Sequence, residues 1–343
     1  MSLGKHKGPL DNRSMAFLFV LLLSWNVSAG EPDNFSARRD TKAVVANEEI
    51  NKAINAVLDM NLQEFPARFG CDRKKFLDFV QDDLDRNLPQ VYKAVYVNAP
   101  IAGPRSAKEV PYRAGRPYTD LYFSQSYKVD INGQIFYIGL DKIDHFFAHG
   151  ATYWDMIGQD PLLPKDKVKK ALEVGVMQEQ ATWGLQRPGV KSYADLSANY
   201  QGLYFWRDLF DGKPAIAVCK NGRFVKNREF KIEDYFVPSM DETINCNSYA
   251  NQEMYQAIKK VTDKWGQKCP AVDGPCEQMK SKNGDFASLL LHPRCLGTGT
   301  SQVEKASAMT TKDVVDTAQA VMGGGANYLL FKLFGEKKGQ GVR

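Results

Sequence analysis

The chain has 343 residues, of which 43% are hydrophobic and 25% are charged, and its formal net charge is +5. This is the composition of an ordinary globular protein, long enough for one large domain or two smaller ones. The mild charge, with no long basic run, argues against a nucleic-acid-binding protein, which usually carries a concentrated basic patch.

The N-terminus has the pattern of a secretory signal. Residues 15–29 read MAFLFVLLLSWNVSA, so an apolar run follows the basic residues Lys5, Lys7 and Arg13 and ends in small residues before Gly30. This order matches a signal peptide with its cleavage site. An uncleaved anchor is the alternative, but the run is short for a membrane span of about 20 residues. We therefore expect a signal peptide over 1–29 and a protein that works outside the cytoplasm, in the periplasm or secreted.

Two helices and a loop are predicted next. Residues 30–46 are polar, and we expect a flexible segment there. Apolar residues then recur at helical spacing in Glu48–Met60 and Arg73–Asp85, which predicts an N-terminal helical unit over 47–97. Four prolines in 98–118 predict a long loop that separates this unit from the rest of the chain.

A central helical body with hairpins is predicted over 119–265. Asn132-Gly133 lies between two β-prone segments, Leu121–Ile131 and Gln134–Gly139, and this dipeptide favours a β-hairpin. Asn221-Gly222 predicts a second hairpin in the same way. Helical spacing predicts helices over Lys142–Ile157, Lys167–Trp183, Tyr193–Leu209, Tyr249–Trp265 and Thr311–Val321. The expected fold class is mainly α with small β-hairpins (α+β), with a central three-helix unit.

The cysteines indicate disulfide bonds. There are six, and all but Cys71 lie after residue 218: Cys219, Cys246, Cys269, Cys276 and Cys295. An even number in an exported protein is typical of disulfides, so we expect a stapled C-terminal segment over 266–343 with a terminal helix. The pairing is open, and Cys269 and Cys276 are near enough to close a small loop. The apolar segment 326–334 is a packed helix or, alternatively, a peripheral membrane contact.

Polar residues occupy inward positions on the three central helices. On the first, Asp141, His145 and His149 are spaced by four and share one face. On the second, Glu179 falls on the apolar stripe, where an unpaired carboxylate is costly. On the third, Asn199 is again polar on an inward face. The simplest arrangement that satisfies these groups is a shared hydrogen-bonded or metal-bound site.

A divalent metal such as zinc is one possible occupant of this site. Two histidines spaced by four on a helix can both bind zinc. The candidate metal ligands are His145, His149, Glu179 and Asp141. Each also has a structural alternative: His145 and Asp141 as a pair, His149 as a surface residue, and Glu179 as a satisfied carboxylate. Asp195 has one too, because Ser192 and Asp195 match a capping box in which Asp195 returns to the Ser192 backbone N–H.

The residues also carry a resemblance. Asp141-Lys142-x-x-His145-Phe146, then Glu179-Gln180, Arg187 and Ser192-x-x-Asp195-x-x-x-Asn199-x-x-Gly202, resembles the signature of the VanZ-like and YfiM-like envelope proteins. The match is confined to the central region 141–202. It implies a location in the cell envelope and a functional site, without defining a reaction. Carried over by this resemblance are Asp141, Lys142, His145, Glu179, Asp195 and Asn199.

Two functions remain open at this point. The first is an exported cell-envelope protein with a binding or structural role, acting on an unknown envelope component. The second is an envelope hydrolase, possibly metal-dependent. There Glu179 is a general base or metal ligand with His145 as its partner, while Asn199 and Lys142 stabilise developing charge. The candidate catalytic residues are Glu179, His145, Asn199, Asp195 and Lys142.

A second group of acids and aromatics spans 233–242. It shows no clear periodicity. It lines a cleft, binds a cation or forms a solvated loop.

Overall fold

The computed structural model describes residues 44–98, 126–181, 184–186, 189–264, 266, 268–270, 275–299 and 301–321. The expected signal peptide, most of the expected flexible segment, nearly all of the proline-rich loop and the apolar segment 326–334 lie outside these residues. Residues 121–125 of the first expected strand and Arg187 lie outside them too.

The fold is mainly helical with small antiparallel strand pairs, as the sequence predicts. The longer helices are α2 (Asn47–Glu64), α3 (Arg73–Asn98), α7 (Lys165–Gln180), α8 (Tyr193–Asp211), α9 (Gln252–Lys264), α10 (Pro275–Asn283) and α13 (Thr311–Val321). Between β2 and α7, one continuous helix consists of α5 (Leu140–Asp144), η2 (His145–His149) and α6 (Gly150–Met156). Short helical turns are η1 (Ala67–Phe69), η3 (Ile232–Asp234), η4 (Pro238–Met240), η5 (Gly284–Phe286), α11 (Ala287–Leu290) and α12 (Pro293–Leu296).

Three two-stranded antiparallel sheets complete the described part of the chain. They are β1 (Ser126–Ile131) with β2 (Gln134–Gly139), β3 (Val190–Lys191) with β6 (Ser248–Tyr249), and β4 (Ala217–Lys220) with β5 (Arg223–Lys226). Both expected hairpins are confirmed. Asn132 and Gly133 have φ of 55° and 80°, and Asn221 and Gly222 have 52° and 74°, the left-handed values that this turn type requires.

Some predicted helix ends were wrong. α3 extends to Asn98 instead of ending near Asp85. The helix expected from Tyr249 begins at Gln252, because Tyr249 pairs with Val190 in β6. The helix expected to end at Trp183 ends at Gln180, where the backbone N–H of Ser307 takes up the Gln180 carbonyl. In the last two cases a tertiary contact, not the local pattern, sets the boundary.

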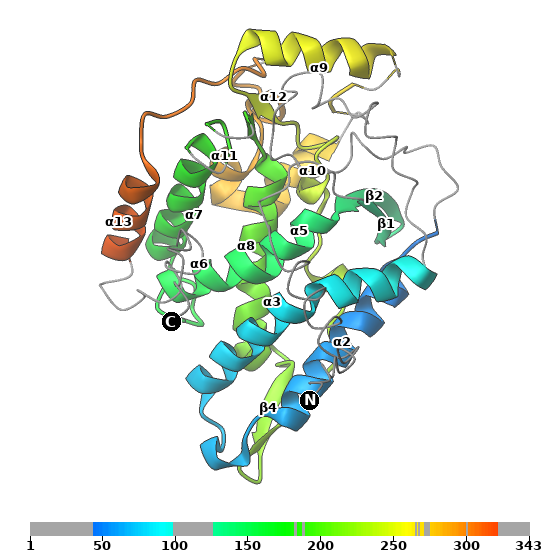
Figure 1. Cartoon of the computed structure of the whole chain (residues 1–343), viewed down its shortest axis with the longest axis vertical. Helices are drawn as coiled ribbons and strands as arrows, with labels where there is room; N and C mark the ends of the chain where they lie inside the picture. Colours follow the sequence, from blue (N-terminus) through cyan, green and yellow to red (C-terminus); the bar gives the residue numbers. More distant parts are fainter. Residues whose placement is uncertain are drawn as a thin grey trace, which may run out of the picture.

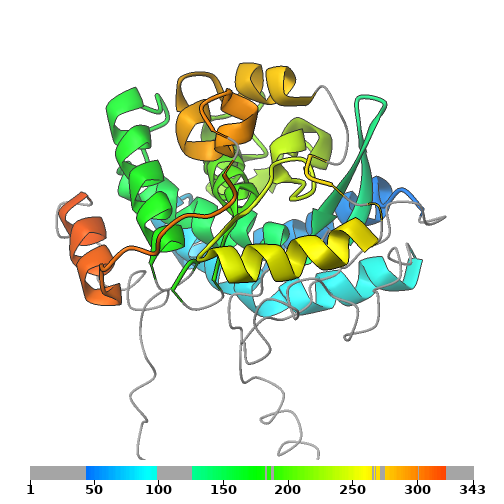
Figure 2. The same cartoon turned by 90° about the horizontal axis from the view of Figure 1, so that it is seen from above.

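Helix α8 runs through the middle of the molecule (Figure 1). Most of its side chains are buried, and Phe205 packs against an aromatic group that includes Phe146, Phe230 and Tyr235. α2 and α3 lie at one end, α9 lies at the other, and α7 and α13 lie side by side. Seen from above, the β1–β2 hairpin stands near α2 (Figure 2), where the Asn47 side chain bonds the Asp130 backbone. One hydrophobic core extends from α2 to α13.

All six cysteines are paired. The disulfides join Cys71 to Cys219, Cys246 to Cys269 and Cys276 to Cys295. The small loop between Cys269 and Cys276, one of the open pairings, does not form: the chain turns so that each cysteine meets a different partner. Two disulfides staple the C-terminal part, as expected, and the third ties the segment before α3 to β4.

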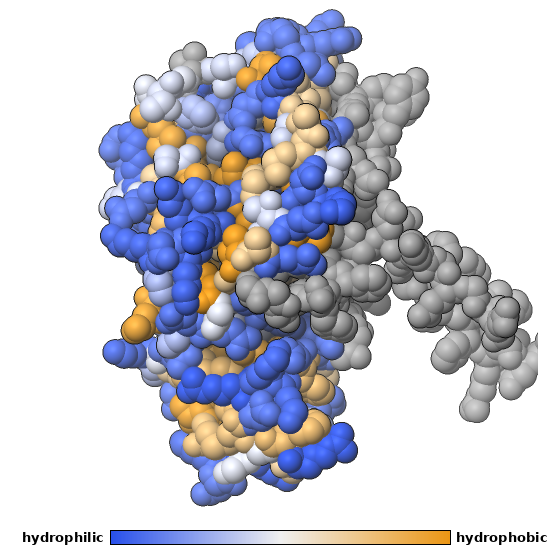
Figure 3. All heavy atoms as spheres, turned by 90° about the vertical axis from the view of Figure 1, so that its left-hand side faces the viewer, coloured by the Kyte–Doolittle hydropathy of each residue, from blue (hydrophilic) through white to orange (hydrophobic). Residues whose placement is uncertain are grey.

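The disulfides and the surface of the protein give information on its cellular compartment. No helix in the described ranges is long and apolar enough to cross a membrane. The face that carries α7 and α13 is mostly hydrophilic, with scattered hydrophobic side chains (Figure 3). Three disulfides and no free thiol fit an oxidising or extracellular compartment.

Candidate functional site

The helix after β2 changes its winding at the expected histidines. Residues His145–His149 form a π-helical segment between two α-helical ones. Such segments are rare and occur frequently at functional sites. Here the wider turn places the rings of His145 and His149 in a stack, with centroids 4.6 Å apart and planes 13° apart.

Helix α8 packs directly on this π-helical segment. A Cβ atom on Gly202 would lie only 1.8 Å from the Phe146 carbonyl oxygen, so only glycine permits the contact. Trp206 donates its indole N–H to the Phe147 carbonyl at 2.9 Å. This close approach sets α8 so that Asn199 and Asp195, one and two turns before Gly202, face His145.

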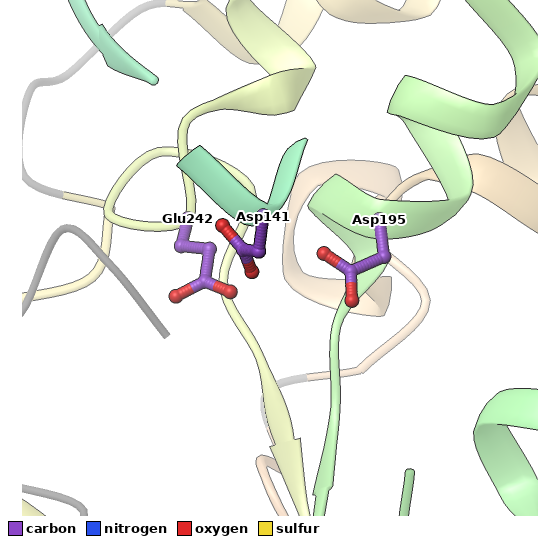
Figure 4. Close-up of side chains that lie close together, drawn as sticks. All are labelled: Asp141, Asp195 and Glu242. Carbon is purple, nitrogen blue, oxygen red and sulfur yellow. The ribbon is translucent and has the colours of Figure 1, made fainter. Parts of the chain in front are cut away.

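Lys142 is the centre of the site. Its side chain has no exposed surface, and its Nζ lies 2.6 Å from Asp141, 2.5 Å from Asp195 and 2.9 Å from Glu242. The three carboxylates point toward one another from α5, from α8 and from the segment after η4 (Figure 4). A lysine ammonium has three N–H donors, so three carboxylates satisfy it completely. We call Asp141, Lys142, Asp195 and Glu242 the lysine cluster.

His145 makes a polar contact at each ring nitrogen. Nε2 lies 3.2 Å from Asp195 Oδ2, and Nδ1 lies 2.9 Å from Asn199 Oδ1. The Asn199 amide in turn donates to the Tyr153 hydroxyl at 3.4 Å. The contacts with Asp195 and Asn199 orient the imidazole ring of His145 toward α8.

The N-terminus of α8 is capped by Ser192 together with Glu179, and not by Ser192 together with Asp195. The Ser192 hydroxyl accepts from the Asp195 backbone N–H at 3.2 Å, as in the expected capping box. The Ser192 backbone N–H, however, donates to Glu179 Oε2 at 3.0 Å, in the place that Asp195 was expected to take. Glu179 thus releases the Asp195 carboxylate to bind Lys142 and His145.

Burial changes the acidity of two of these groups. It raises the pKa of Glu179 well above its usual value, and the nearby Asp195 carboxylate raises it further. Burial also lowers the pKa of His149 to about 3, with a further decrease from neighbouring His145. Burial thus favours the protonated form of Glu179, and His149 is a neutral imidazole at neutral pH.

The structure brings most of the predicted site residues together. Direct contacts join Asp141, Lys142, His145, Asp195 and Asn199. Glu179 joins them through the Ser192 N–H, and His149 through its stacked ring. The common interior predicted for His145, Glu179 and Asn199 is therefore present.

One member of the lysine cluster was not singled out from the sequence. Glu242 lies in the acid-rich segment 233–242, where no helical or strand period indicates which side chains point inward. Both Asp241 and Glu242 are fully buried, so the solvated-loop alternative was wrong at these positions. Glu233, at the other end of the segment, binds the amides of Asn47 and Asn51 on α2 instead.

The lysine cluster offers oxygen ligands for a metal ion. One carboxylate oxygen each of Asp141, Asp195 and Glu242 lies within 4.8 Å of the others, and all three side chains are buried. Of the four predicted metal ligands, only Asp141 belongs to this group. Both nitrogens of His145 are already engaged, so a zinc site on the His145–His149 pair requires a rearrangement. A metal at the carboxylates would compete with the Lys142 ammonium for the same oxygens.

Comparison of the chain with protein-family models, with curated proteins and with solved structures gives no match. The resemblance of residues 141–202 to VanZ-like and YfiM-like proteins therefore stays a prediction. The functional interpretation depends on the geometry of the lysine cluster and its histidines.

Proposed function

We propose that this protein is exported and works in the cell envelope, where its central site has a binding role. The signal-like N-terminus, the three disulfides and the resemblance to envelope proteins support this location. The test is to express the full chain from its own start. We expect the mature protein in the extracytoplasmic fraction, beginning near Gly30, with all six cysteines resistant to alkylation before reduction. Retention in the cytoplasm with free thiols would contradict the proposal.

The observation that carries the binding role is the saturated Lys142. Its ammonium lies within ion-pair distance of three carboxylates, so its three N–H groups are engaged and it is not a free nucleophile. Buried ionic networks of this kind fix the relative positions of the segments that carry them. The lysine cluster therefore forms one rigid side of a binding site.

A ligand can reach the lysine cluster from the side where His145 and His149 lie. The side chain of His145 is 10% exposed and that of Asp141 is 9% exposed, whereas Lys142, Asp195 and Glu242 have none. His149 is half-buried beside them. Three carboxylates against one ammonium leave the cluster negative, so the ligand we propose is a cation, and a divalent metal such as zinc is the first probe.

Metal binding is tested on the purified mature protein by equilibrium dialysis with Zn²⁺, Mn²⁺ and Ca²⁺. Asp141→Asn and His149→Ala should each weaken binding by about tenfold or more without loss of the helical circular-dichroism signal. Glu277→Gln, on the exposed surface of α10, is the control and should leave binding unchanged. If none of the three ions binds, the metal version is wrong. Equal binding by all variants would place the metal elsewhere.

A hydrolase is the second candidate, and the position of His145 between Asp195 and Asn199 favours it. A histidine oriented by a carboxylate and an amide is a common arrangement for acid–base catalysis, and a buried carboxyl with a raised pKa, like that of Glu179, suits proton transfer. The measurement is turnover of chromogenic ester, phosphate and glycoside substrates. Loss of turnover in His145→Asn and in Glu179→Gln, at a melting temperature no lower than that of the wild type, would support catalysis. No turnover by the wild-type protein on any of the three classes would count against it.

A further inference from the structure

Helix α9 lies at one end of the molecule (Figure 1). It rests on a second hydrophobic cluster, formed by Val190, Cys246, Tyr249, Met254, Ile258 and Cys269. The Cys246–Cys269 disulfide closes the loop that carries the helix. This second hydrophobic cluster shares no residue with the lysine cluster.

A small pocket of about 120 Å³ lies between α9, β6 and the first turn of α12. Its walls include Tyr249 and Tyr255, whose rings are stacked with centroids 5.9 Å apart, and the buried side chain of Gln302. The pocket therefore has room for a small ion or functional group with some bound water.

The charges that line this pocket are mostly positive. Lys259, Lys268 and Arg294 are cationic, and Asp263 is the one acid among the lining residues. Asp263 is already paired with Lys259 on the same helix. Arg294 thus places a guanidinium beside a low-dielectric wall of rings and a disulfide, which favours an anion.

Arg294 supplies the directed contacts. One terminal nitrogen of its guanidinium, Nη1, donates to the Cys269 carbonyl, which holds the side chain at the pocket. Within the described ranges Arg294 forms no ion pair with a carboxylate, so its remaining N–H groups stay available for a ligand. A planar guanidinium with two parallel N–H groups matches two oxygens of a phosphate.

We propose that this pocket binds a phosphate-sized oxyanion, with Arg294 as the bidentate donor and Lys268 as a second positive charge. The ligand is the phosphoryl group, either of a free phosphate or of an anionic lipid headgroup. The site shares no lining residue with the cation site proposed at the histidines.

The test is calorimetric titration of the mature protein with inorganic phosphate at fixed ionic strength, with acetate as the comparison anion. We expect saturable binding of one phosphate, weaker binding of acetate, and a loss of about tenfold or more in Arg294→Gln. Arg294→Lys keeps the charge and loses the planar fork, so its affinity should be intermediate. Lys280→Gln, on α10 outside the pocket, is the matched control and should bind as the wild type does.

Two further measurements make the outcome unambiguous. Circular dichroism verifies the fold of each variant, and Lys268→Gln replaces Arg294→Gln if the latter fails to fold. Flotation with phosphatidylglycerol vesicles, with and without competing phosphate, distinguishes the lipid headgroup from the free anion. No saturation by phosphate and no phosphate-sensitive vesicle binding would overturn the proposal. Equal affinity in the wild type and the pocket variants would also overturn it, because the anion would then be adventitious.

Discussion

Replacement of Lys142 by methionine tests whether the lysine cluster stabilises the fold. Methionine fills a similar volume and has no charge, so three buried carboxylates lose their common partner. Removal of one partner from a buried ionic network costs about 3–5 kcal/mol in the free energy of unfolding. Typical domains have only about 5–15 kcal/mol in total. We therefore expect Lys142→Met to be folded but severely destabilised at pH 7.

The pH dependence of this variant is the second part of the prediction. Carboxylates that repel one another take up protons more readily in the folded state than in the unfolded chain. The folded variant then binds more protons than the unfolded one, so its stability falls as pH rises. The destabilisation of Lys142→Met relative to the wild type should be largest near pH 7–8 and smaller near pH 5.

The assay is urea denaturation followed by circular dichroism at pH 5 and pH 7, with Lys280→Met as the control. Lys280 is paired with Glu277 at the surface, where an ion pair contributes little. The reasoning is refuted if Lys142→Met lies within about 1 kcal/mol of the wild type at pH 7, since mutual repulsion of three buried carboxylates exceeds that. A destabilisation that is independent of pH would indicate lost packing instead of unpaired charge.

Three further predictions concern groups around the site and the core. Glu179→Gln keeps an acceptor for the Ser192 N–H and cannot ionise. Because the raised pKa of Glu179 makes the wild type lose stability as pH rises above about 4.5, the variant should gain relative to the wild type between pH 5 and pH 8 in urea melts. Burial lowers the pKa of His292 to about 4, so the wild type should lose stability as pH falls from about 6.5 toward 4. His292→Asn, which can still accept from the Arg294 N–H, should reduce this loss, and an unchanged acid profile would contradict the assignment. Gly202→Ala should cost about 3 kcal/mol, measured by thermal melting, because its methyl group would meet the Phe146 carbonyl; a melting temperature equal to the wild type would show that α8 can move away.

The extent to which the site could be predicted follows from the kind of signal each residue leaves. His145, Glu179 and Asn199 were found because helical spacing fixes the direction of a side chain, and a polar residue in an apolar stripe stands out. Both hairpins were predicted because Asn-Gly between two β-prone segments strongly favours a hairpin turn. These signals are local, and they hold whatever the rest of the chain does.

Other features depend on contacts between distant parts of the chain. Glu242 joins Lys142 across 100 positions of sequence, from a segment with no regular period. Asp195 fits a capping box by its spacing, yet Glu179 takes its place at the Ser192 N–H. The π-helical turn at His145–His149 has no sequence signature, because an ordinary α-helix fits the same letters. The disulfide pairing could not be predicted from the spacing of the cysteines, because it depends on how distant segments fold together.

The origin of the lysine cluster also has a consequence for how the chain matures. Its three acids come from positions 141, 195 and 242. The cost of removing the Lys142 ammonium from water is therefore offset only when all three segments have folded together. A chain that has assembled the first two regions without the third gains little by excluding solvent from Lys142. Completion of this centre therefore coincides with completion of the fold, because Lys142 stays hydrated until Glu242 is in place.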